Sequence, residues 1–125
     1  EPIPGDALGD YAVHETARNK HEEAFKVLVE QGADLAVTNK HGYTALMVAA
    51  TKGLLSSVAL ALNKGAKVDA QDNNGWQALH LAAQGGHVTV VELLLEKKAD
   101  VKAGANDGQQ ALHLAAYGGH VTVVE

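Results

Sequence analysis

Histidine is the residue type in this chain that could most directly do chemistry. Three pairs of histidines are each seven residues apart, namely His14 and His21, His80 and His87, and His113 and His120. An imidazole can ligate zinc or act as a general base, and positions i and i+7 of one helix lie on the same side. The first hypothesis is therefore a metal site or an acid–base site.

The sequence between the paired histidines argues against that chemistry. Gly86 and Gly119 interrupt any helix that would carry both imidazoles of the last two pairs. The chain has no cysteine, and zinc sites favour Cys and His ligands at shorter spacing. The sequence also has no Ser–His–Asp arrangement, phosphate-binding loop or His-Glu-x-x-His pattern. We therefore expect no enzyme, no metal and no cofactor.

A repeat gives the paired histidines another role. Glycines recur at an interval of 33 residues, at Gly9, Gly42, Gly75 and Gly108. The sequence around them repeats too, since residues 78–92 differ from residues 111–125 only at Gln84 and Tyr117. A period of about 20–50 residues marks stacked supersecondary units. Six of the seven histidines follow this period and are assigned to the scaffold, whereas His41 lies in a loop tip.

Each unit is predicted to contain two short helices and a tight turn. In the third unit, residues 76–86 and 87–98 carry apolar residues at helical spacing, with a glycine pair between the two segments. The turns fall at His41-Gly42, Asn74-Gly75 and Asp107-Gly108. Such dipeptides favour hairpins in which both central residues take positive φ. We expect an all-α solenoid of helix–turn–helix units with β-hairpin finger loops.

The composition limits the class of partner. The formal net charge is −5, and the ten Lys and Arg residues form no run, which argues against nucleic acid. No apolar run approaches the about 18 residues that a membrane-spanning helix requires. Since the chain has no cysteine and does not begin with a signal peptide, we expect a cytoplasmic protein, with the nucleus as the alternative compartment.

The repeat resembles the ankyrin repeat. That family has a Thr-Pro-Leu-His-x-Ala-Ala first helix, a Gly-His turn and a Val-Val-x-Leu-Leu-Leu second helix. Residues 44–50, 77–83 and 110–116 are similar to the first helix, and Gly86-His87 is similar to the turn. The resemblance covers residues 9–125. It implies that the first histidine of each pair bonds a neighbouring loop and that the second lies between the two helices.

Two registers depart from the family pattern. The proline that opens the family's first helix is alanine in each unit, at Ala12, Ala45, Ala78 and Ala111. Lys98 stands where Gly32 and Gly65 end the second helix of earlier units. If this register needs positive φ, lysine there costs about 1 kcal/mol relative to glycine.

The period divides the chain into a leader and one repeat domain. Residues 1–8 carry two prolines and no periodicity, and we expect a flexible leader there. Repeats are expected at about 9–41, 42–74, 75–107 and 108–125, the last one truncated within its second helix. A truncated repeat has no polar capping face. We therefore expect a fragment of a larger protein, able to self-associate through its C-terminal repeat.

Differences between near-identical copies indicate where a partner binds. The copies vary after the periodic glycine, at the end of the first helix and in the loop tips. In the ankyrin family, such positions resemble the concave groove and finger tips that contact partners. The candidate protein-binding residues are Lys40, His41, Tyr43, Thr51, Lys52, Asn73, Asn74, Trp76, Gln84, Asn106, Asp107, Gln109 and Tyr117.

Trp76 is the strongest of these candidates, and two interpretations of it stay open. It is the only Trp, and the sister repeats have Tyr43 and Gln109 in its place. Exposed Trp and Tyr residues are frequent interface hot spots. The alternative is that Trp76 covers a neighbouring finger, and the same two interpretations apply to Tyr43 and Tyr117. Phe25 lies in an apolar stripe and is assigned to the core.

The function expected from the repeat is protein–protein interaction. A stacked scaffold presents a rigid surface, so that little ordering entropy is lost on binding. We expect a module of a larger intracellular signalling or scaffold protein, with a protein partner of unknown identity. The alternatives are a small ankyrin-type inhibitor of a kinase or transcription factor, and an engineered ankyrin scaffold.

Overall fold

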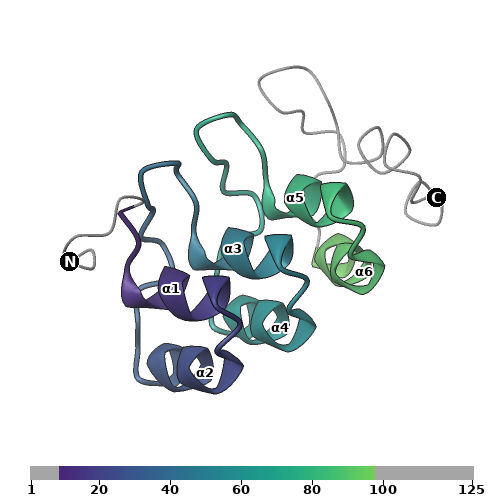
Figure 1. Cartoon of the computed structure of the whole chain (residues 1–125). Coiled ribbons are helices and arrows are strands. Elements are labelled where there is room, and N and C mark those ends of the chain that lie inside the picture. The colour runs from purple at the N-terminus through teal and green to yellow at the C-terminus, as the bar shows by residue number, and fades with distance from the viewer. Residues whose placement is uncertain (1–8, 98–125) are drawn as a thin grey trace.

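The 33-residue period of the sequence reappears as three helical units. A computed structural model describes residues 9–97, and these residues form six helices in two layers (Figure 1). The first helices are α1 (Ala12–Arg18), α3 (Ala45–Thr51) and α5 (Ala78–Gln84). The second helices are α2 (Glu22–Glu30), α4 (Leu55–Asn63) and α6 (Val88–Glu96). The expected all-α solenoid is confirmed for this part of the chain.

Several sequence predictions fall outside residues 9–97. They concern the leader at residues 1–8, the truncated fourth repeat, Lys98, and the candidates Asn106, Asp107, Gln109 and Tyr117. No helix in the described part of the chain is long and apolar enough to cross a membrane.

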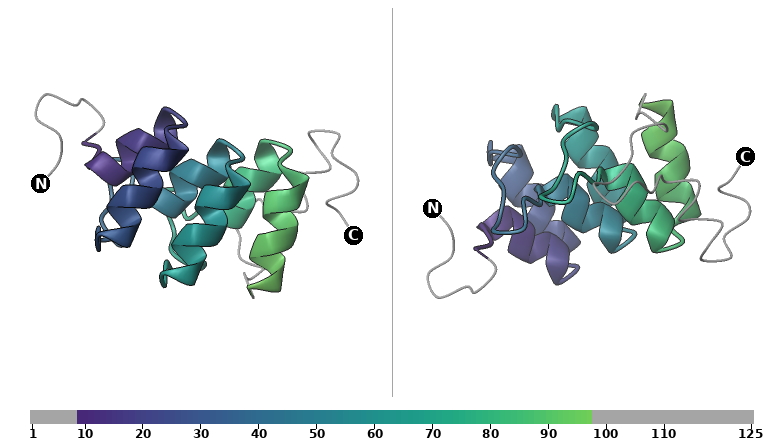
Figure 2. Two further views of the ribbon diagram at one scale, coloured as in Figure 1. Left: turned by 90° about the horizontal axis from the view of Figure 1, so that it is seen from below. Right: turned by 90° about the horizontal axis from the view of Figure 1, so that it is seen from above.

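Each layer is a row of neighbouring helices. Figure 2 shows the second helices side by side from below, and the finger loops in front of the first helices from above. Helix α3 contacts α1 on one side and α5 on the other, and α4 packs between α2 and α6. Every unit therefore rests on its neighbours, as expected for a solenoid.

Alanine allows the first helices to approach closely. Helix α3 buries every residue from Ala45 to Ala50, and the pair Ala49 and Ala50 is fully buried. Ala82 and Ala83 in α5 are fully buried too. Because alanine has no side chain beyond Cβ, two such helices can pack backbone to backbone at little entropic cost. The chain has few aromatic residues, and these small residues fill much of the core between the first helices instead.

The second helices bury one apolar stripe each. Helix α6 buries Val90, Val91 and Leu94, and its outward Leu95 is 37% exposed. The Val-rich start of this segment could have formed a strand, but its continuation to Glu96 supplies the helical period and length. Phe25 of α2 is fully buried, which confirms its assignment to the core.

The finger loops differ from the predicted β-hairpins. No strand occurs among residues 9–97, and the only residue other than glycine with positive φ there is Lys20. In the first finger, Gly42 N–H donates to Asn39 O and Asn39 N–H donates to Tyr43 O. Gly42 alone takes positive φ, at 80°. The loop is therefore a four-residue turn that ends in a left-handed glycine, and not a turn with two left-handed centres.

A side chain explains why no strand pair extends from this turn. The Asn39 Oδ1 atom accepts from the N–H groups of His41 and Tyr43 at 2.9 and 3.1 Å. Asp72 does the same in the next finger, with Asn74 and Trp76 at 2.8 and 2.9 Å. The Tyr43 and Trp76 amides are the donors that would complete a strand pair with Asn39 and Asp72, whereas His41 and Asn74 lie inside the turns. Local side-chain bonds of this kind compete with regular secondary structure.

Successive fingers are fastened to each other at their tips. Asn73 donates from its Nδ2 to Lys40 O at 2.8 Å and from its backbone N–H to His41 O at 3.0 Å. A Cβ atom added at Gly42 would lie 2.5 Å from the Asn73 Oδ1. The periodic glycine is thus required twice, by its positive φ and by this close approach.

Lys20 occupies a register that glycine fills in the other units. Its φ is 59°, and the corresponding Gly53 and Gly86 have φ of 71° and 75°. Left-handed backbone costs an L-residue roughly 1–2 kcal/mol. The turn after the first helix is therefore strained in the first unit and relaxed in the other two.

We predict that Lys20→Gly stabilises the protein by about 1 kcal/mol, because it removes this strain. Lys64→Gly is the matched control, since Lys64 is also an exposed lysine just after a helix but has φ of −95°. The control should lower the free energy of unfolding, because glycine adds entropy to the unfolded chain. Thermal and urea unfolding measure both changes. Stabilisation by both variants, or by neither, would contradict the assignment of strain.

Candidate protein-binding surface

In the first unit, the structure brings two variable registers together. One is the residue after the periodic glycine, and the other is the last residue of the first helix, eight positions later. In the first unit these residues are Asp10 and Arg18. Their side chains form a two-pronged ion pair, with Nε to Oδ2 at 2.8 Å and a second guanidinium nitrogen to Oδ1 at 3.0 Å. The two registers are therefore direct neighbours.

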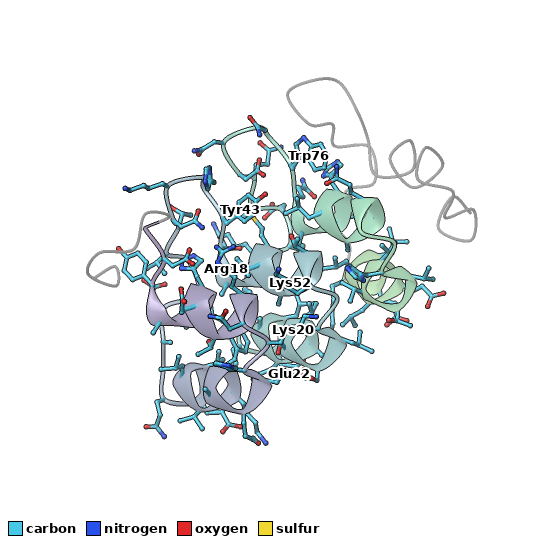
Figure 3. All side chains as sticks on the ribbon, viewed as in Figure 1. Arg18, Lys20, Glu22, Tyr43, Lys52 and Trp76 are labelled. Carbon is cyan, nitrogen blue, oxygen red and sulfur yellow. The ribbon has the colours of Figure 1, made fainter. Side chains whose placement is uncertain are left out.

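The same two registers hold Tyr43 and Thr51 in the second unit and Trp76 and Gln84 in the third. Figure 3 shows Tyr43 and Trp76 on the finger side of the first helices, Arg18 and Lys52 near those helices, and Glu22 lower, in the second layer. The variable residues thus lie on one face, made by the fingers and the first helices.

Most of the predicted contact residues are exposed on this face. The exposed ones are Lys40, His41, Thr51, Lys52, Asn73, Asn74 and Gln84. Tyr43 and Trp76 are half-buried. Asn73 also has the structural role described above, since it fastens one finger to the next.

The two aromatic rings divide their surface between the core and solvent. Both pack against the hydrophobic core, and the Trp76 ring lies 6.2 Å from the ring of His80, centroid to centroid. Burial raises the pKa of Tyr43, the charge of Asp72 raises it further, and the charge of Arg18 opposes both. Tyr43 therefore lies between the first unit and the second finger. Its role and that of Trp76 in binding stay predictions.

The first histidine of each pair is part of the scaffold. His14 is fully buried, and its Nδ1 accepts from the Tyr11 N–H at 2.9 Å. Its Nε2 therefore carries the proton, which it donates to the carbonyl oxygen of Tyr43 at 2.7 Å. His80 is likewise fully buried and accepts from the Gln77 N–H at 2.9 Å. The bond from His14 to the next loop confirms the role that the resemblance implied.

In the two pairs within residues 9–97, the second histidine lies in the turn between the helices. His21 and His87 are the residues before α2 and α6. The His87 Nε2 lies 2.9 Å from the carbonyl oxygen of Thr51 and so ties the third unit to the second. Within residues 9–97, no group of three or more His, Asp and Glu side chains is placed to hold a metal ion.

Sequence reasoning missed the ion pair of the first unit. The 33-residue register aligns Asp10 with Tyr43, and Arg18 with Thr51, so that the signal was present in the sequence. Asn39 completes the cluster by donating from Nδ2 to the Asp10 Oδ1 at 2.9 Å. Asp10 is fully buried, and the pair therefore belongs to the scaffold as well as to the variable face.

A comparison with known families agrees with this architecture. A family model described as ankyrin repeats, in three copies, matches residues 3–72 and 55–125. The chain belongs to the ankyrin repeat family. No curated protein matches the chain. Ankyrin repeats are in general protein–protein interaction modules and are typically not enzymes.

The ionisation of Asp10 contributes to the stability of this ankyrin stack. Burial raises the pKa of Asp10, but hydrogen bonds from Arg18 and Asn39 and the charge of Arg18 outweigh burial and hold the pKa below the ordinary 3.8. A carboxyl with a lowered folded-state pKa stabilises the fold above its unfolded-state pKa. That contribution is lost as the pH falls below 3.8 through the lowered value.

We predict that Asp10→Asn lowers the free energy of unfolding at pH 7 by about 1–3 kcal/mol, because it removes the ion pair of Arg18. The gap between wild type and variant should narrow as the pH falls below 3.8. Asp69→Asn is the control, since Asp69 is exposed. Urea unfolding from pH 7 to pH 2 measures the effect. A gap of constant size across this range would refute the contribution of Asp10 ionisation.

Proposed function

We propose that this ankyrin domain binds a protein partner through the face formed by its fingers and first helices. The observation that carries the proposal is the contact between Asp10 and Arg18. It joins the two registers in which the copies differ, whereas the helix residue before the second register is a fully buried alanine in each described unit, at Ala17, Ala50 and Ala83. A surface that varies on a constant scaffold is what selective recognition requires.

The rigidity of the fingers supports this proposal. Each finger base is held by Asn39 or Asp72, and the tips are linked by Asn73. The residues offered to a partner thus sit on backbone that is already ordered. Binding to such a surface costs less conformational entropy than binding to free loops.

The finer assignments remain proposals from the sequence. They are a place in a larger intracellular signalling or scaffold protein, and the cytoplasm as its compartment.

The test exchanges residues between registers of the chain itself. Trp76→Gln and Tyr43→Gln introduce the residue that Gln109 holds at the same register. We predict that the double variant captures its partners from a cell extract at least about tenfold less well, because it loses the two large aromatic contacts. Quantitative mass spectrometry of the captured proteins measures the loss.

The control removes exposed apolar side chains from the other layer. Val27 in α2 and Leu55 in α4 are 55% and 42% exposed, and the variant with both changed to alanine should keep its partners. Circular dichroism verifies that both variants stay folded. If the aromatic variant kept every partner and the control lost them, the second helices would be the binding surface instead.

A further inference from the structure

The exposed charged residues at the finger tips and just after helices α1 and α3 are lysines. Lys40 at the first finger tip and Lys52 after α3 are exposed, and so is Lys20 after α1. None of the three forms an ion pair with a residue of the described range 9–97. The Arg18 side chain adds a guanidinium that is 28% exposed. This cationic character contrasts with the net charge of −5 of the whole chain.

The acidic residues of the same face are withdrawn from solvent. Asp10 and Asp72 are buried and hold the ion pair and the second finger, respectively. Glu15 is half-buried and accepts a hydrogen bond from the Asn19 side chain at 3.0 Å. Glu15 also occupies the register of Val48 and Leu81, which are buried in the later units. The face therefore offers a partner cations but few free carboxylates.

The second-helix layer exposes charges of both signs. Its exposed acidic residues are Glu22, Glu23, Glu30, Glu92 and Glu96, and its exposed lysines are Lys26, Lys64 and Lys97. The two layers therefore differ chiefly in their exposed carboxylates, so that the net charge does not describe the finger and first-helix face. Exposed charges arranged in this way steer association and select partners by electrostatic complementarity.

We propose that the finger and first-helix face binds an acidic segment of a partner protein. This inference rests on the proposed function and specifies the chemistry of the partner. Lys40 and Lys52 supply the cations. Tyr43, which lies between them along the chain, and Trp76 in the next unit supply half-buried aromatic surface. The matching segment carries Asp or Glu residues together with an apolar side chain for the aromatic rings.

Local structure accounts for part of the pattern but not for all of it. Lys52 follows the last turn of α3, where a cation is favoured by the helix dipole. Lys40 has no such reason, since it lies in a loop. Its backbone carbonyl accepts a hydrogen bond from Asn73, so that its side chain starts from an ordered backbone position. A partner that bears negative charge would give this cation an ion pair that residues 9–97 do not supply.

The test selects peptides from a random library displayed on phage against the purified full chain. We expect the selected pool to be enriched in Asp and Glu over the input pool. The emission of Trp76, the only tryptophan, then reports binding of single synthetic peptides from this pool. Lys40→Glu with Lys52→Glu should weaken the binding of these peptides at least about tenfold, and added salt should weaken binding to wild type.

The control reverses the same number of charges on the other side of the molecule. Lys26 and Lys64 are exposed lysines of α2 and of the residue after α4. Changing both to Glu alters the net charge by the same amount, and peptide affinity should stay within about twofold of wild type.

Other outcomes separate this inference from the proposed function. A neutral or basic pool whose binding depends on Trp76, as shown by calorimetry on Trp76→Gln, would overturn the acidic partner and leave the binding face in place. If the pool is acidic but its binding is unchanged by substitution of Lys40, Lys52 and Trp76, both the acidic partner and the binding face are overturned. A selection that yields no peptide would overturn both as well. Binding of a single-stranded oligothymidylate that depends equally on Lys40 and Lys52 would replace the acidic protein with a nucleic acid.

Discussion

The finger loops are held in place by hydrogen bonds that run from one unit to the next. At the first joint, the His14 Nε2 donates to the carbonyl oxygen of Tyr43, from a ring that is fully buried. The same ring accepts from the start of its own helix, so that its orientation and its tautomer are fixed together. At the second joint Met47 occupies the register of His14, and the bonds come instead from Asn73 to the carbonyl oxygens of Lys40 and His41 and from His87 to that of Thr51. These bonds place each finger relative to its neighbour, and the variable face is built on the fingers.

The separation of scaffold from surface follows from this arrangement. Buried helix residues and the histidines His14 and His87 make the contacts between units. Exposed positions outside these contacts can therefore change without loss of packing. The first unit shows what happens when two free positions interact. Asp10 and Arg18 neutralise each other, so that the first unit offers less free charge than its composition suggests. The second and third units instead present aromatic and polar side chains at the same registers.

The sequence was sufficient to predict the helices, the period and the scaffold role of the histidines. These features depend on spacing that repeats, and repetition removes the ambiguity of any single segment. The finger geometry was predicted wrongly because Asn39 and Asp72 bond the amides that a strand pair would have used. The dipeptide rule considers backbone preference alone and cannot anticipate that competition. The positive φ of Lys20 was missed for a related reason, since tertiary context there overrides the preference of lysine.

Net charge was the least informative property for the binding face. A value of −5 argues against nucleic acid as a general partner, yet it averages over two layers of opposite character. A solenoid makes this averaging severe, because the outer faces of its two helix layers meet solvent separately. The electrostatic property that a partner senses is therefore the charge of one outer face within about a Debye length. For the finger and first-helix face that charge includes Lys40 and Lys52, whereas the second helices expose glutamates together with lysines.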